Sequence, residues 1–136
     1  MSTTGDDAVG VPADATDAEV ARYDAAFLAA RRILDEGIRA LAISKELEDD
    51  PDVQSDIGTA LLKLQSDRLA LVQANIDFHA LKATMTPPSA DLVAQIVELA
   101  RTATGFTARR ASAAAVLRVT TLALQKFAAI QNIART

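Results

Sequence analysis

The C-terminal part of the chain carries more apolar surface than a helix at the edge of a globular domain needs. Eight large apolar side chains occur in a short segment: Val116, Leu117, Val119, Leu122, Leu124, Phe127, Ile130 and Ile133. On a helix they cover roughly 220° of the circumference, whereas a surface helix needs an apolar stripe of about 100° or somewhat more. Such a helix requires several packing neighbours, in this chain or in another. The sequence is therefore more informative about how the chain packs and associates than about any reaction it could catalyse.

The composition predicts an all-α protein. Of the 136 residues, 50% are hydrophobic but only 4% are aromatic, and the chain has five glycines and four prolines. This composition is typical of helices, and the length suits one domain with its own core. The low aromatic content disfavours an enzyme pocket and a surface on which nucleic-acid bases stack.

Cysteine is absent, which excludes a disulfide framework, a thiolate nucleophile and a cysteine-ligated metal. The first residues lack the basic and apolar regions of a cleaved signal peptide. Arg118 and Lys126 interrupt the most apolar segment, so no membrane-spanning helix is expected. These features predict a cytoplasmic protein by default, or one exported by a signal-independent route.

The N-terminal half contains two helix start signals. Residues 1–15 lack periodicity and are expected to form a disordered acidic tail, followed by a single helical domain over 16–136. Thr16 and Glu19 fit a capping box that opens a helix over 17–48. Asp50 suits the N-cap and Pro51 the first position of a second helix, expected over 51–84.

The second helix carries two apolar columns with a seven-residue repeat. The first column is Ile57, Leu64, Leu71, Phe78 and Met85. The second, about 140° around the helix, is Leu62, Leu69, Ile76 and Ala83. Two columns on one helix imply two packing partners.

A pair of prolines, Pro87 and Pro88, ends the second helix, and Ser89 caps a third one over 90–134. A straight helix of that length would measure about 67 Å, against about 50 Å for the first two. The third helix therefore either bends and folds back at Gly105 or protrudes beyond the others. Because the connections are short, we predict an up-down-up bundle of three long antiparallel helices with coiled-coil-like packing.

Charge is distributed unevenly along the chain. Residues 1–56 contain 14 acidic and 5 basic side chains, whereas residues 99–136 contain 6 basic and no acidic ones. An acidic first helix and a basic last helix attract each other when they pack side by side. Six acidic residues surround the connection between the first and second helices and form what we call the acidic corner: Glu46, Glu48, Asp49, Asp50, Asp52 and Asp56. It lacks the spacing and the glycine of a calcium loop, so we interpret it as a solvated turn, with a partner-binding corner as the alternative.

A polar row lies between the two apolar columns of the second helix and consists of Arg68, Asn75, His79 and Lys82. These side chains either form a binding or proton-transfer site inside the bundle, or they satisfy one another and fix the register of the helices. We favour the structural role.

The chain shows no pattern that indicates catalysis. A Glu-x-x-His pair for a di-iron site, a glycine-rich phosphate loop and a Ser/His/Asp grouping are all absent. No catalytic residue, cofactor, metal or small-molecule substrate is therefore predicted. The basic residues after Glu98 scatter around the helix, so nucleic acid is not an expected partner.

The turn at Asp50, Pro51 and Asp52, with the Leu- and Gln-rich helix after it, resembles the helix–turn–helix hairpin of type III secretion needle subunits. The resemblance covers residues 34–85, and the chain has in addition the helix expected over 90–134, which needle subunits lack. The resemblance implies self-assembly into a helical filament.

Together these features predict a non-enzymatic helical interaction or structural assembly protein. We expect a homo-oligomer, or a complex with another helical protein. The predicted contact surface lies on the C-terminal helix and comprises Val119, Leu122, Phe127, Ile130 and Ile133. The alternatives are an adaptor or secretion-chaperone-like module that binds a partner's amphipathic helix, a filament subunit, and a membrane-active helical protein.

Overall fold

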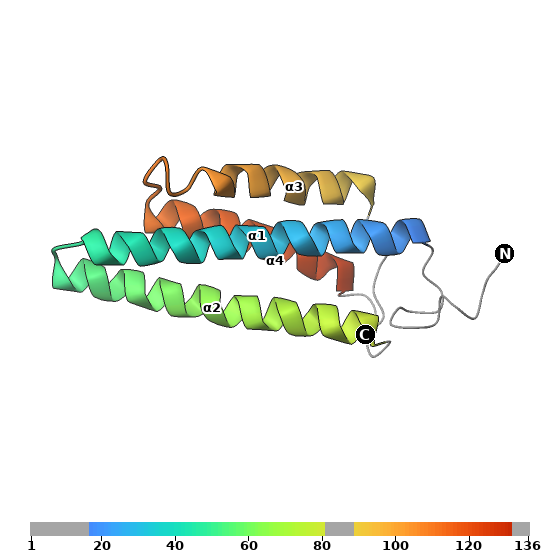
Figure 1. The fold of residues 1–136 in the computed structure, drawn as a ribbon, viewed down its shortest axis with the longest axis horizontal. Helices are drawn as coiled ribbons and strands as arrows, with labels where there is room; N and C mark the ends of the chain where they lie inside the picture. The colour runs from blue at the N-terminus through green and yellow to red at the C-terminus, as the bar shows by residue number, and fades with distance from the viewer. Residues whose placement is uncertain (1–16, 81–88, 132–136) are drawn as a thin grey trace.

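The computed structural model describes residues 17–80 and 89–131, with side chains up to residue 128, and these residues form four helices (Figure 1). The helices are α1 (Asp17–Leu47), α2 (Pro51–His79), α3 (Ala90–Thr104) and α4 (Ala113–Gln131). No strand occurs in the described part of the chain, so the protein is all-α, as the composition predicts. The predicted tail over 1–15 and the predicted cap Thr16 lie outside the described residues.

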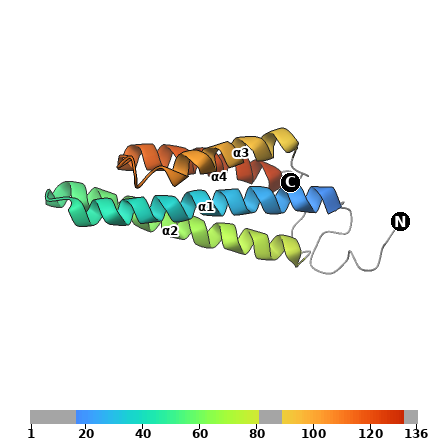
Figure 2. The same ribbon diagram turned by 45° about the horizontal axis from the view of Figure 1, so that its top comes forward.

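The first helix is the central element. α1 contacts α2, α3 and α4, and α4 also contacts α2 and α3, whereas α2 and α3 do not touch each other. Figures 1 and 2 show α2 and α3 on opposite sides of α1. α1 runs antiparallel to α2 and α4 and parallel to α3. α1 and α4 therefore each have three neighbours, but α1 makes the more extensive contacts, and α2 packs mainly against α1.

The third helix expected over 90–134 is two helices in the structure, because α3 ends at Thr104 and α4 begins at Ala113. The chain folds back through a Schellman motif, in which the Ala111 amide donates to the Phe106 carbonyl (2.9 Å) and the Arg110 amide to the Thr107 carbonyl (3.2 Å). Arg110 takes the left-handed conformation (φ 50°) that the motif requires. Of the two sequence-based alternatives, folding back near Gly105 is the one that the structure shows.

Side-chain caps define three of the helix starts. The Asp50 carboxylate accepts from the Asp52 amide at 2.9 Å, and Pro51 occupies the first turn of α2. The Ser89 hydroxyl accepts from the Leu92 amide at 3.1 Å, so both predicted caps are confirmed. The Ser112 hydroxyl accepts from the Ala115 amide and caps α4, which the sequence did not reveal.

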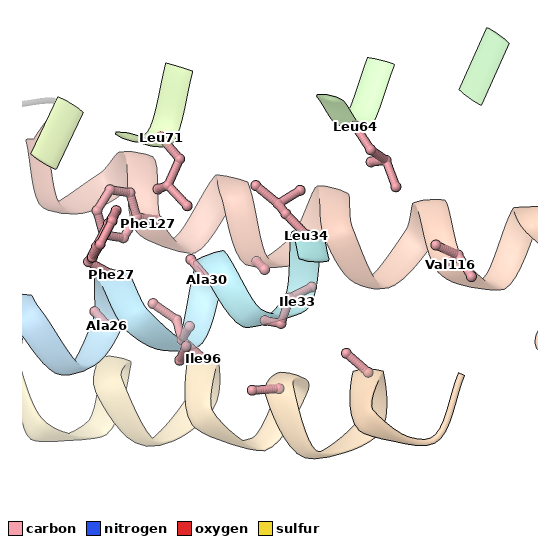
Figure 3. Close-up of a cluster of buried hydrophobic side chains, with 14 of the residues drawn as sticks. Ala26, Phe27, Ala30, Ile33, Leu34, Leu64, Leu71, Ile96, Val116 and Phe127 are labelled. Atoms are coloured by element: carbon pink, nitrogen blue, oxygen red, sulfur yellow. The ribbon is translucent and has the colours of Figure 1, made fainter. Parts of the chain in front are cut away.

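The core runs along α1 and receives side chains from every other helix (Figure 3). Its labelled members are Ala26, Phe27, Ala30, Ile33, Leu34, Leu64, Leu71, Ile96, Val116 and Phe127. Near the start of α1, the ring of Tyr23 stacks on Phe78 with centroids 3.9 Å apart and lies 5.5 Å from Phe127. Burying each large apolar side chain contributes about 1.5–3 kcal/mol, so this cluster is the main source of stability.

At Gly37, the helices α1, α2 and α4 approach one another closely. A Cβ atom at this position would lie 3.1 Å from Leu64 Cδ1 of α2, 3.1 Å from Val116 Cγ1 of α4 and 3.3 Å from Thr120 Cγ2. The absence of a side chain therefore allows α2 and α4 to approach α1 closely at the same level.

Within the described residues, no helix has the length and apolar character needed to cross a bilayer.

Candidate interaction surface

The two apolar columns of α2 have different environments. The first column packs into the core, where Ile57, Leu64, Leu71 and Phe78 are buried. The second column faces solvent: Leu62 is 68% exposed, Leu69 is 70% exposed and Ile76 is 53% exposed. Met85 and Ala83, which continue the columns in the sequence, lie outside the described residues. The second packing partner that the sequence requires is therefore not another helix of the described chain.

No charged residue lies within about 60° of this exposed column on the helix. Between Ser55 and Ile76, the residues within about 60° of the column on the helix are Ser, Thr, Gln, Gly and Val. We call this surface the outer face of α2; it consists of Leu62, Gln65, Ser66, Leu69, Gln73 and Ile76. A solvated helix face normally concentrates charged side chains opposite the core. The outer face of α2 therefore has the composition of a contact surface.

The packing of α2 explains why this face stays open. α2 lies against α1 along its length and touches α4 less extensively, and none of the other described helices covers its far side (Figure 1). The arginine, aspartate and histidine side chains that join α2 to α1 lie on the inner side. The outer face of α2 is thus the side of the helix that points to solvent, since the other helices contact α2 from the opposite side.

The C-terminal residues predicted as a contact surface occupy different environments. Phe127 is only 3% exposed and lies between the rings of Tyr23 and Phe27, at centroid distances of 5.5 and 6.5 Å. Val119 packs partly buried against the core, and Leu122 is 40% exposed. The side chain of Ile130 and the whole of Ile133 lie outside the described residues. Phe127 is thus a core residue, because the fold-back of α4 supplies the neighbours that its broad apolar face needs.

The polar row of α2 faces α1. Arg68 Nε donates to Asp35 Oδ1 at 2.6 Å, and His79 Nε2 lies 3.1 Å from Asp24 Oδ1. Both pairs are partly exposed and span two helices, an arrangement that selects one register of α2 on α1. Asn75 Oδ1 is buried without a hydrogen-bond partner, and Lys82 lies outside the described residues.

The acid–base behaviour of Tyr23 departs from that of an ordinary tyrosine. Its hydroxyl is buried without a hydrogen-bond partner. Burial raises the pKa of Tyr23, and the nearby carboxylates of Asp24 and Asp77 raise it further. A phenol in this state keeps its proton, so it acts as part of the core and not as an acid or a base at neutral pH.

A pocket of about 400 Å³ lies between the end of α1 and the turn after α3. Its walls include Ile43, Leu47 and Phe106, together with Glu48 and Arg110. In the described part of the chain, no three His, Asp or Glu side chains are grouped closely enough to hold a metal ion, and this includes the acidic corner.

Comparison of the chain with protein-family models, with curated proteins and with solved structures finds no similar protein. The function of the chain is therefore inferred from its own surfaces. Among the described residues, the outer face of α2 carries three large apolar side chains that are each more than half exposed, Leu62, Leu69 and Ile76.

Proposed function

We propose that this chain is a non-enzymatic helical assembly protein that associates with copies of itself. The observation that supports the proposal is the outer face of α2, where Leu62, Leu69 and Ile76 are each more than half exposed along two helical heptads, with no charged residue within about 60° of them on the helix. Removing apolar surface from water contributes about 25 cal/mol per Å², so a face of this kind gains free energy when a complementary surface covers it.

Self-association is also what the sequence predicts, but the contact surface proposed here lies on α2 and not on the C-terminal helix. The sequence directed attention to the C-terminal helix, where Phe127 is now accounted for by the core and Leu122 is 40% exposed. The outer face of α2 offers three large apolar side chains in register, so it is the better candidate for the contact. The single-helix protrusion that the sequence allowed is not needed for this function.

Sedimentation velocity over a range of concentrations tests the proposal. The wild-type chain is expected to sediment as a dimer or a larger species, and a Leu69→Lys variant to shift towards the monomer, because a buried ammonium without a partner is strongly unfavourable. Leu28→Lys is the matched control: Leu28 is 60% exposed on α1 and is not part of the outer face of α2, so its replacement should leave association unchanged. Circular dichroism confirms that both variants remain helical.

A wild-type chain that sediments as a monomer at every concentration contradicts self-association. A Leu69→Lys variant that sediments like the wild type would also remove the support that the outer face gives. In that case the C-terminal residues, beginning with Leu122, become the surface to vary next.

A further inference from the structure

We propose that the outer face of α2 pairs with the same face of a second copy, with the two α2 helices antiparallel and a twofold axis beside Leu69. This inference deepens the proposed function and rests on it, since it names the partner and the geometry of the association. Three observations carry it: the symmetry of the column, the charges beside it and the position of the acidic corner.

The column is symmetric about Leu69. Leu62 and Ile76 each lie one heptad away from it, in opposite directions, and both are exposed. In an antiparallel pair centred on Leu69, Leu69 meets its own copy, and Leu62 of each chain meets Ile76 of the other. Ser66 then lies opposite Gln73, so polar side chains that form hydrogen bonds meet one another. Every large apolar side chain of the face finds an apolar counterpart.

The charges beside the column are complementary in this arrangement. Lys63 and Asp77 both lie about 100° from the column on the same side of α2. A twofold axis perpendicular to antiparallel helices brings equal sides together, and the register centred on Leu69 places Lys63 within about 3 Å, along the helix axis, of the level of Asp77 in the second copy. Lys63 already pairs with Asp67 at 2.7 Å, so it would join two acidic side chains.

The acidic corner distinguishes antiparallel from parallel pairing. Its six acidic residues lie at the α1–α2 end of the molecule, where Glu46, Asp49 and Asp56 are exposed. Parallel pairing through α2 would place two such corners side by side, which is unfavourable. Antiparallel pairing separates them by roughly 50 Å, well beyond the Debye length of about 10 Å at moderate salt.

Cysteine cross-linking tests the geometry directly, because the chain contains no cysteine of its own. Under mild oxidation, Leu69→Cys is expected to form a disulfide-linked dimer. Leu62→Cys alone should not, since the two copies of residue 62 would be separated by about 21 Å along the axis, far beyond the reach of a disulfide. A mixture of Leu62→Cys and Ile76→Cys chains should form the mixed disulfide. Leu28→Cys, on α1, is the control for random collision.

A charge exchange provides a second, independent measurement. Lys63→Asp should raise the dissociation constant of the dimer roughly tenfold, because each copy then faces Asp77 with a like charge at two symmetric places. Combining Lys63→Asp with Asp77→Lys should restore most of the affinity. A double variant as weak as the single one contradicts the proposed contact.

The cross-linking outcomes separate this inference from the proposed function. Efficient self-cross-linking of Leu62→Cys, without the mixed disulfide, shows parallel pairing and overturns the inference while self-association stands. A wild-type dimer that gives no cross-link at Leu69→Cys places the contact elsewhere and also overturns it. A monomeric wild type overturns both proposals.

Discussion

Tyr23 combines a favourable position for its ring with an unfavourable one for its hydroxyl. The ring stacks on Phe78 and contacts Phe127, while the hydroxyl is buried without a hydrogen-bond partner. An unpartnered buried hydroxyl costs about 1–3 kcal/mol, whereas an aromatic contact contributes about 0.5–1.5 kcal/mol. The aromatic ring of Tyr23 therefore stabilises the fold, whereas its hydroxyl does not.

We predict that Tyr23→Phe leaves stability at neutral pH unchanged or raises it by up to about 1 kcal/mol. The variant should also resist alkaline unfolding. Because burial raises the pKa of Tyr23, the native state keeps the proton where the unfolded chain releases it. The stability that the wild-type protein gains by keeping Tyr23 protonated is fully present below pH about 10. It is lost as the pH rises above that value.

Urea unfolding of both proteins between neutral and alkaline pH measures this effect. Since Tyr23 is the only tyrosine, the absorbance of tyrosinate reports its ionisation without interference. An ordinary tyrosine pKa in the folded protein would contradict the prediction.

Arg110 holds a left-handed backbone conformation that glycine adopts more easily. Its φ of 50° is required by the Schellman motif that ends the turn after α3. We predict that Arg110→Gly raises the free energy of unfolding by about 1 kcal/mol, because the strain at Cβ disappears. Thermal unfolding should shift upwards by a few degrees. Ala108→Gly, two residues earlier in the same turn, is the control and should be destabilising.

At the level of helices, two interior glycines are expected to respond oppositely to substitution. Gly58→Ala should stabilise by about 0.5–1 kcal/mol, since alanine favours the helix and the new methyl group meets only the flexible end of Lys45. Gly37→Val should destabilise by about 1–3 kcal/mol, because Leu64, Val116 and Thr120 are buried and cannot move freely. Denaturant midpoints compare the two. Stabilisation by Gly37→Val would show that α2 and α4 can shift away from α1 and make room for the valine side chain.

The sequence predicted helix starts better than helix ends. Asp50 and Ser89 have the side chains that N-caps use, and both act as caps. The fold-back at 105–112 was only one of two alternatives, because the residue in the left-handed position is arginine, where glycine would have marked it. The seven-residue repeat predicted two faces for α2 but not which of them the chain itself would cover.

For the molecule as a whole, Phe127 connects the end of α4 with α1 through the rings of Tyr23 and Phe27. We predict that Phe127→Ala lowers the free energy of unfolding by about 3–5 kcal/mol. Leu122→Ala, at a position 40% exposed on the same helix, should lose much less. Chemical denaturation measures both. If Phe127→Ala dissociated an oligomer but left unfolding unchanged, the residue would be a contact residue, as the sequence first suggested.

The apolar excess of the C-terminal segment shows why the sequence alone did not indicate which apolar surface the chain leaves uncovered. The sequence established that the segment needs several neighbours, but whether they belong to the same chain depends on the turn at 105–112. Once that turn places α4 against α1, Val116 and Phe127 are buried without any second molecule. The uncovered surface then appears on α2, whose repeat looked less unusual.

The central position of α1 has a consequence for the way the molecule opens. Backbone amides exchange with solvent deuterium when a helix separates from its neighbours, and α1 has neighbours on three sides. Its middle turns, around Ile33 and Leu34, should hold their protons longest. α2, supported mainly along one side, should lose them earlier, and it should become slower to exchange as the protein concentration rises if its free side finds a second molecule.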